Sequence, residues 1–218
     1  MAHRVAKGLV GGCALLLGVT VAGCGAPQYT YVANSSESAY FKVPQGWHKI
    51  DGGALQRAME QVLGSPGAGW QVAYEAGADP TASDFLGFAS DQPFVFAEVG
   101  TLTSAGSQQL SYDALRDFFG LPVTSTARQN LPPGYPLTDF KHIRDENLTP
   151  GLGVHGVRET FDYTLNGGLT DTFDEVALTN ADQTVVYLLM LHCSESCYDA
   201  DRTAINDVMS SFTVRSSP

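Results

Sequence analysis

Two cysteines near the C-terminal end have a spacing that could support either of two kinds of chemistry. Cys193 and Cys197 are four residues apart, and His192 precedes the first of them. In an exported protein such a pair is most simply a disulfide, which closes a small loop and stabilises the fold by about 2 kcal/mol. The alternative is a metal site formed by all three residues, but their spacing does not match a usual zinc pattern. We therefore predict a Cys193–Cys197 disulfide and no metal ion.

The residues that could act in catalysis do not form a known pattern. The sequence contains no Gly-x-Ser-x-Gly nucleophile motif, no His-Glu-x-x-His motif and no Gly-x-x-x-x-Gly-Lys phosphate loop. The histidines His48, His142 and His155 are not at the spacing of metal ligands. We expect each to be an ordinary surface or core residue. The sequence thus predicts no catalytic residue, no cofactor and a protein that is not an enzyme.

Two further groups of side chains could form a binding surface. Asp171, Asp174 and Glu175 cluster on one expected strand. A solvated face is the main expectation for them, and an acidic patch for a cation or a partner is the alternative. Four aromatic residues could line a groove, although packing in the core explains most of them more simply: Tyr29, Tyr31, Trp70 and Phe85.

Another cysteine stands at the end of a segment typical of export. Arg4 and Lys7 precede an uncharged apolar run over residues 8–20. The run is too short for a membrane-spanning helix, which needs about 20 residues, and it matches the hydrophobic region of a signal peptide. It ends in Val-Ala-Gly-Cys at residues 21–24, which resembles the lipobox of bacterial lipoproteins. The resemblance implies cleavage before Cys24 and a diacylglyceryl group, with fatty acids such as palmitate, on its thiol.

This anchor predicts an extracytoplasmic location on the outer face of the cell membrane. Each methylene group buried in the bilayer contributes about 0.8 kcal/mol to membrane binding. Two acyl chains therefore anchor a protein stably, whereas one chain binds only marginally. Residues 24–37 would then be a lipidated tether, in which residues 29–33 could pair as an edge strand. The alternative is an uncleaved anchor helix, or a secreted protein with a chance cysteine. Cys13 also follows small residues, but cleavage there would leave almost no hydrophobic region.

The composition excludes some partners. Removal of residues 1–23 takes away Arg4 and Lys7 but no acidic residue, so the net charge changes from −11 to −13. Nucleic-acid binding needs a basic face, and none is visible. With 44% hydrophobic and 16% charged residues, the chain is expected to fold around a core and not to be a disordered stalk.

The elements that must position these residues follow from hydrophobic periodicity. Helices are expected at about 53–63 behind Asp51, at 111–119 behind Ser111, and in a last helix that Ser194 or Ser196 caps. Long irregular segments are expected at 77–92 and 120–136. Strands are expected at 40–43, 70–74, 93–102, 137–147, 154–165, 169–178 and 184–191. The strand at 184–191 is apolar on both faces, which indicates that both faces of the sheet are covered. This pattern predicts an α+β fold, an antiparallel sheet covered by helices.

The order of these elements is similar to that of a known fold. Its markers are Phe-Lys-Val-Pro-Gln-Gly-Trp at 41–47, the hairpin around Asn166-Gly167, the apolar strand at 184–191 and Ser-Ser-Phe-Thr-Val at 210–214. Together they resemble the PsbP-like fold, and within it the actinobacterial LpqN-type lipoproteins, over about residues 38–214. The resemblance implies a single α/β/α sandwich domain on the cell envelope. Members of this fold mostly act as binding, assembly or adaptor modules, and no residue-level function carries over.

The expected function is therefore that of a membrane-anchored, non-catalytic binding or adaptor lipoprotein of the cell envelope. Its partner would be an envelope protein or another envelope component. A small-molecule or lipid carrier, with a cavity between sheet and helices or under the 120–136 segment, is the alternative. An uncharacterised hydrolase is a further one, and it would require a nucleophile and a base within hydrogen-bond reach.

Overall fold

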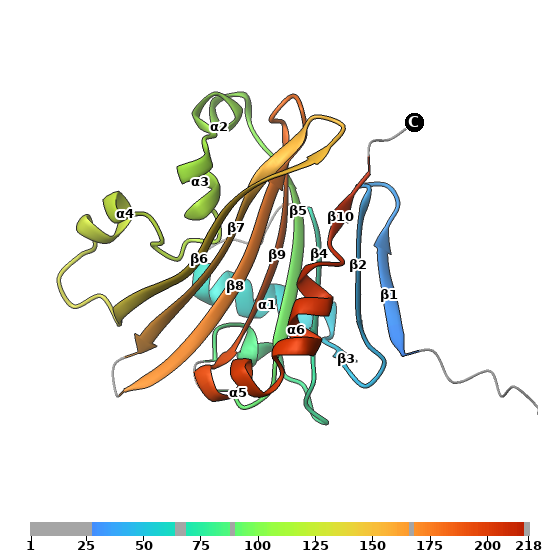
Figure 1. Cartoon of the computed structure of the whole chain (residues 1–218), viewed down its shortest axis with the longest axis vertical. Helices are drawn as coiled ribbons and strands as arrows, with labels where there is room; N and C mark the ends of the chain where they lie inside the picture. The colour runs from blue at the N-terminus through green and yellow to red at the C-terminus, as the bar shows by residue number, and fades with distance from the viewer. Residues whose placement is uncertain (1–27, 64–68, 88–89, 166–167, 216–218) are drawn as a thin grey trace, which may run out of the picture.

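A seven-stranded antiparallel sheet forms the centre of the computed structural model (Figure 1). The structure describes residues 28–63, 69–87, 90–165 and 168–215. Neighbouring strands of the sheet follow this order: β3 (His48–Lys49), β4 (Trp70–Glu75), β5 (Phe94–Thr101), β9 (Val185–Ser194), β8 (Leu169–Thr179), β7 (Val154–Leu165) and β6 (Leu137–Gly151). The predicted α+β fold with an antiparallel sheet is therefore confirmed.

A second, three-stranded sheet lies beside the first. It has the order β1 (Tyr29–Asn34), β2 (Ala39–Pro44) and β10 (Thr213–Val214). β1 pairs with β2 along its whole length, with Tyr29 opposite Pro44 and Asn34 opposite Ala39. Part of the predicted tether is thus an edge strand. Figure 1 shows β1 at the outer edge of this small sheet, on the side away from the curved hairpin strands β6–β8.

The helices begin largely where their caps predict. The backbone N–H of Ala54 donates to Asp51 Oδ1 at 2.8 Å, that of Ala114 to Ser111 Oγ at 3.1 Å, and that of Cys197 to Ser194 Oγ at 3.2 Å. Within the described residues, no helix has the length and apolar character needed to cross a membrane. The helical segments are α1 (Gly52–Leu63), the 3₁₀ helix η1 (Ala82–Leu86), α2 (Ser104–Gln109), α3 (Tyr112–Arg116), α4 (Ser125–Gln129), α5 (Glu195–Ala200) and α6 (Arg202–Met209).

Three helical predictions need correction. The last helix is two short helices, because Asp201 leaves helical geometry between α5 and α6. The helix behind Ser111 ends at Arg116 and not at Phe119. The segment 120–136 is not a bare loop, since Thr124 caps α4 within it. In each case the segment is too short for apolar periodicity to reveal its ends.

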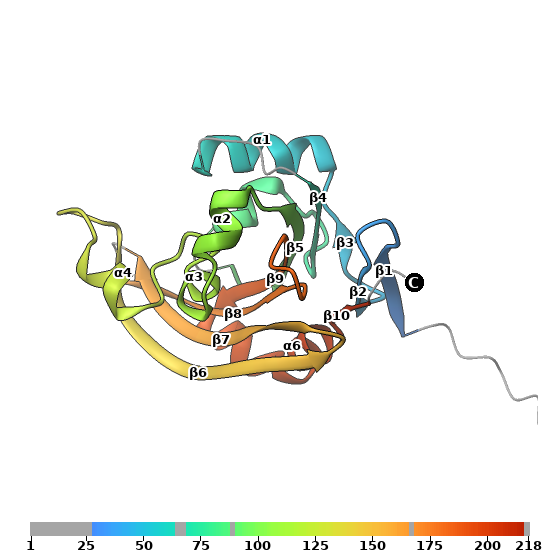
Figure 2. The same cartoon turned by 90° about the horizontal axis from the view of Figure 1, so that it is seen from above.

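Two hydrophobic cores lie on opposite faces of the large sheet. One core joins α5, α6 and the small sheet to the strands, with Phe41, Leu189 and Ile205 among its members. The other lies beneath α1, η1 and α3, with Met59, Phe85 and Leu115. Figure 2 shows α1 and α6 on opposite sides of the sheet. The predicted coverage of both faces is therefore present, and it explains why β9 is buried along nearly all of its length.

The long strand β6 forms one edge of the large sheet. It runs for 15 residues and pairs with β7 alone. Its register shifts at three places: between Thr138 and Lys141, between His142 and Arg144, and between Leu148 and Gly151. Such shifts bend a strand and redirect its side chains. From this strand, Asp145 contacts Arg116 of α3, and His142 contacts Glu159 of β7.

Candidate functional site

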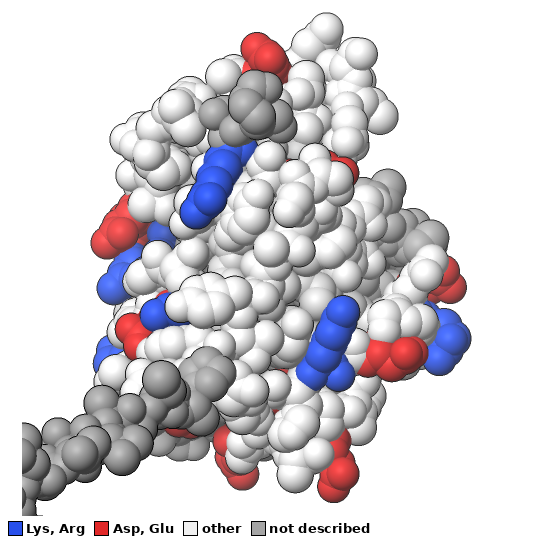
Figure 3. All heavy atoms as spheres, turned by 90° about the vertical axis from the view of Figure 1, so that its right-hand side faces the viewer, with Lys and Arg blue, Asp and Glu red and all other residues white. Residues whose placement is uncertain are grey.

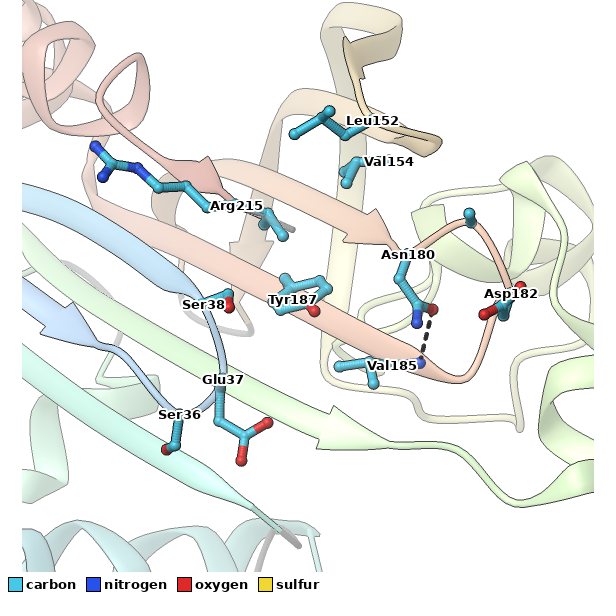
Figure 4. A pocket seen from close by; sticks show the side chains of 12 residues that line it. Ser36, Glu37, Ser38, Leu152, Val154, Asn180, Asp182, Val185, Tyr187 and Arg215 are labelled. Atoms are coloured by element: carbon cyan, nitrogen blue, oxygen red, sulfur yellow. Dashed lines mark hydrogen bonds between the residues drawn. The ribbon is translucent and has the colours of Figure 1, made fainter. Parts of the chain in front are cut away.

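A surface pocket opens where three β-hairpins end together. The turns β1–β2, β6–β7 and β8–β9 meet beside β10 and enclose about 360 Å³. Figure 4 shows Tyr187 in the middle, with Leu152 and Val154 on one side and Ser36 and Glu37 on the other. We call this the hairpin-end pocket. Strands of the rigid sheet therefore position its walls, and turns supply its rim.

The backbone of this rim adopts left-handed conformations at residues that are not glycine. Ser38, Leu152 and Gln183, one in each of the three turns, have φ values of 59°, 57° and 55°. A left-handed backbone is uncommon for residues other than glycine and asparagine. Leu152 also exposes 72% of its surface, although exposure of an apolar side chain to water is unfavourable. The rim thus holds an exposed apolar side chain in a strained position.

The pocket has a mixed polar and apolar lining. Tyr187 is buried at its base, and burial together with the nearby carboxylate of Glu37 raises the pKa of its hydroxyl. Asn180 ties the β8–β9 turn together, since its Oδ1 accepts from the backbone N–H groups of Thr184 and Val185 at 2.8 and 3.1 Å. Arg215 lines the pocket from the end of β10. This arrangement suits recognition of a partner with both apolar and polar groups.

A second candidate is a group of charges between α3 and strands β6–β8, which we call the α3 charge cluster. Arg116 Nε donates to Glu159 Oε1 at 2.8 Å, and Arg116 Nη2 donates to Asp145 Oδ1 at 2.6 Å. The other oxygen of Glu159 lies 2.6 Å from His142 Nε2. Burial, together with Asp145, raises the pKa of Glu159 to about 7, while His142 opposes the rise.

Glu175 adds an uncompensated carboxyl to this cluster. It lies opposite Glu159 on the neighbouring strand, and neither of its oxygens has a hydrogen-bond partner. Burial and the charge of Glu159 raise the pKa of Glu175 well above that of an ordinary glutamate. Neutral carboxylic acid is therefore the form that this interior favours.

The α3 charge cluster has the donor set of a cation site but already contains a cation. One ligand atom each from His142, Asp145 and Glu159 lies within 4.8 Å of the other two. The carboxylates, however, already bind the guanidinium of Arg116, which donates to Glu159, Asp113 and Asp145. Its geometry is that of a partly buried ion-pair network, with Glu159 buried and Asp145 exposed, that joins α3 to the sheet.

The structure joins Cys193 and Cys197 in the predicted disulfide, with 5.9 Å between their Cα atoms. The alternative metal site is not present among these residues, because both sulfurs are bonded to each other. His192 lies on the other face of β9, where its ring stacks on Phe173 and its Nδ1 lies 3.2 Å from Asp171 Oδ2. Alternate residues of a strand point to opposite faces, which separates His192 from Cys193.

The solvated face predicted for Asp171, Asp174 and Glu175 is wrong. All three are buried, at 0–1% exposure. Asp174 accepts from Arg158 at 2.9 and 2.7 Å and from the Tyr198 hydroxyl at 2.8 Å. These partners lie on β7 and α5, so sequence alone could not pair them with β8. The unusual density of charge on two neighbouring strands was the one signal available.

The remaining predicted residues are dispersed. Phe85 is buried in the core, and Trp70 packs against the opposite core. Tyr31 instead exposes 79% of its surface on β1, so core packing does not explain it. Cys24, the predicted lipidation site, lies outside the described residues, as do Asn166 and Gly167. The hairpin predicted around those two is nevertheless present, since Leu165 on β7 pairs with Leu169 on β8.

Comparison with known proteins identifies the fold. No family profile and no curated protein sequence matches the chain. Among solved structures, the cyanobacterial PsbP (CyanoP) of Synechocystis matches with a TM-score of 0.53 and 16% identity, over 94% of this chain and 99% of that one. LpqN of Mycobacterium tuberculosis, involved in cell envelope biogenesis, matches with a TM-score of 0.44 and 17% identity, over 87% and 91% of the two chains. The Ran-binding protein Mog1p of Saccharomyces cerevisiae matches with a TM-score of 0.45 and 8% identity, over 85% and 95%.

At 16% sequence identity, the structural similarity to CyanoP indicates a shared fold and not a shared activity. The two sheets, the helices on both faces and the near-complete overlap with CyanoP agree with one another. The chain is a PsbP-fold protein.

Proposed function

We propose that this protein is a non-catalytic binding or adaptor module, anchored by a diacylglyceryl group on Cys24 at the outer face of the cell membrane. Its partner is an envelope protein or another envelope component, which it binds at the hairpin-end pocket. The lipobox-like sequence at residues 21–24 supports the anchor. The PsbP fold of the mature domain is compatible with this role.

Leu152 is the observation that carries the binding role. Its left-handed backbone costs on the order of 1 kcal/mol, and its exposed side chain gains no burial in return. Residues 151 and 153, on either side of Leu152, are both glycine. A glycine or an asparagine at position 152 would adopt the left-handed backbone with less strain. A bound partner that covers the side chain would supply the missing burial.

The carrier alternative finds less support in the described residues. There, the space between the sheet and its helices is filled by the two clusters of buried side chains. The hairpin-end pocket instead opens at the ends of the strands and borders one of these clusters, which includes Val154, Tyr187 and Val214. A surface that binds a partner is therefore favoured over an interior that holds a small ligand.

The test uses the full-length protein in its native envelope. A photo-crosslinking amino acid at position 152 should capture a discrete partner, to be identified by mass spectrometry of both protein and lipid. The Leu152→Asn variant should then lose capture from a second crosslinking position in the pocket, Asp182, by about tenfold or more. Its free energy of unfolding should stay the same or rise by about 1 kcal/mol, because asparagine tolerates the left-handed backbone.

Leu169→Asn is the matched control, since Leu169 is another exposed leucine but lies outside the pocket. It should leave capture unchanged. Equal capture by both variants would contradict the pocket as the binding site. The anchor has a separate test: a Cys24→Ser variant should lose the lipid mass and leave the membrane fraction, and unchanged retention would argue for an uncleaved helix.

A further inference from the structure

The outer face of the small sheet carries tyrosines and basic side chains together. Along β1 and β2 the residues alternate, with Val32, Phe41 and Val43 buried against the core. The residues that alternate with them form the opposite face. We call it the tyrosine–cation face, and it consists of Tyr29, Tyr31, Tyr40, Lys42 and the adjoining Arg215.

The basic groups of this face lie over the aromatic rings. Lys42 Nζ is 3.9 Å from the centre of the Tyr29 ring, and the Arg215 guanidinium is 4.8 Å from that of Tyr40. Tyr31 stands opposite Lys42 in the register of the two strands. A hollow of about 220 Å³ opens between these residues, with Lys42 and Arg215 both in its lining. The hollow therefore offers two cations and apolar ring surfaces to one ligand.

The charge of this face is opposite to that of the protein as a whole. The chain carries a net charge of −11, yet the residues that line the hollow include two basic and no acidic side chains. Asp207 lies at one border, where its Oδ2 accepts from the Tyr29 hydroxyl at 2.7 Å. Figure 3 shows this side of the molecule, with blue side chains around a largely uncharged centre and red ones mainly toward the rim.

The short distance along the chain between this face and Cys24 limits which surfaces the face can contact. Four residues separate Cys24 from Tyr29, so the chain between them spans at most about 18 Å when fully extended. If Cys24 carries the lipid, as proposed above, β1 lies within that distance of the lipid head groups. Tyrosines are favoured at the membrane–water interface, and basic residues near an anionic surface are attracted to it.

We infer that the tyrosine–cation face docks on the membrane by binding the phosphates of anionic phospholipid head groups. The lipid on Cys24 holds the protein to the membrane, and this face sets its orientation. The acidic remainder of the domain strengthens the preference, because an anionic surface repels a domain of net negative charge except where basic side chains meet it.

The experiment measures orientation on the full-length, lipidated protein reconstituted into vesicles. A nitroxide label at Ala33→Cys, an exposed position on β1, reports the depth of the face by electron paramagnetic resonance. In vesicles that contain phosphatidylglycerol the label should be shielded from an aqueous relaxation agent. In vesicles of phosphatidylcholine alone, or at about 1 M salt where the Debye length is about 3 Å, it should be accessible. A label at the exposed Glu60 on α1 should stay aqueous throughout.

The double variant Lys42→Gln/Arg215→Gln should lower the ratio of docked to undocked protein about 25-fold, or about fivefold for each basic residue removed. Arg57→Gln/Arg144→Gln, which removes the same charge from α1 and β6, should leave it nearly unchanged. Equal losses in both variants would overturn the inference, and so would shielding that is the same in neutral vesicles. Failure of the anchor is distinguishable, because the protein would then leave the vesicles, whereas failure of docking leaves it bound with position 33 exposed to water.

Discussion

Glu159 and Glu175 lie directly opposite each other on β7 and β8, and both are buried. Carboxylates at directly opposed positions repel each other, and burial adds the cost of desolvation. Arg116 and His142 compensate Glu159, while neither oxygen of Glu175 has a partner. The pair therefore retains protons that an exposed pair would release.

The protonation of this pair predicts an unusual dependence of stability on pH. The folded-state pKa of Glu159, about 7, lies above the ordinary value of 4.5, and that of Glu175 is also raised. The folded state therefore binds more protons than the unfolded state between pH 4.5 and 7, so the contribution of the pair to stability falls as pH rises through this window. Each carboxyl changes the free energy of unfolding by at most about 1.4 kcal/mol per pH unit.

Glu175→Gln keeps the shape of the side chain and removes its titration. We expect the variant to be more stable than the parent at pH 7.5, by about 1 kcal/mol or more, and nearly equal to it at pH 4.5. Urea unfolding at a series of pH values measures the difference. A difference that is constant with pH would show that Glu175 does not bind a proton on folding.

Arg116 is expected to stabilise the fold through Glu159. Replacement by methionine leaves a buried carboxylate without its guanidinium, which costs about 3 kcal/mol at pH 8. The cost should shrink toward pH 5, where Glu159 is protonated. Chemical denaturation at both pH values checks this.

Arg144→Met provides the comparison for Arg116. Arg144 Nε lies 3.7 Å from Glu146 Oε1, and the two side chains are 37% and 54% exposed. Loss of this exposed pair should lower the free energy of unfolding by less than about 1 kcal/mol at either pH. Similar costs for the two arginines would contradict the view that burial makes the Arg116 contact strong.

The disulfide between Cys193 and Cys197 should stabilise the junction of β9 and α5. Replacement of both by alanine removes the constraint on a short loop of the unfolded chain, and the expected loss is about 2 kcal/mol. Alanine avoids a buried hydroxyl at Cys193, which is fully buried. Denaturant unfolding of the variant and of the parent, each with and without reductant, checks this; a parent insensitive to reductant would contradict it.

Gly156 should be intolerant of any side chain. A Cβ atom there would lie 2.0 Å from the backbone oxygen of Ala177 and 2.8 Å from Leu178 Cα. Both contacts are with the backbone of β8, which cannot move without disturbing its other pairs. Gly156→Ala should therefore cost about 3 kcal/mol or more, as measured by thermal unfolding. Gly46→Ala, whose Cβ would meet nothing within 4 Å, should have a small effect.

The parts of the fold that the sequence predicted are those with a local cause. Apolar alternation marked the strand β7, and the hairpin signal at Asn166-Gly167 marked the return along β8. Asp51 and Ser111 marked the starts of α1 and α3. The disulfide followed from the spacing of the two cysteines. Each of these depends on residues within a few positions of one another.

The parts that sequence could not reveal depend on distant contacts. Arg116 donates a hydrogen bond to Glu159, which is 43 positions away in the sequence. Arg158 donates one to Asn206, which is 48 positions away. Acids on β8 therefore looked solvated, although helices and strands cover both of its faces. The hairpin-end pocket likewise joins the β1–β2 turn to two turns that follow it by more than 100 residues. The left-handed backbone of Leu152 is not predictable from the sequence, because local residue types do not favour that conformation at a leucine.

The irregular strand β6 has a consequence for how the protein behaves when crowded. A long, straight edge strand is a template on which a second molecule can add its own strand and begin to aggregate. The three register shifts of β6 interrupt that template, and the charged side chains of Lys141, Arg144 and Glu146 would be desolvated by such an addition. The opposite edge, β3, is only two residues long. Both open edges of the large sheet are thus poor starting points for polymerisation, which would keep many copies of this domain separate on one surface.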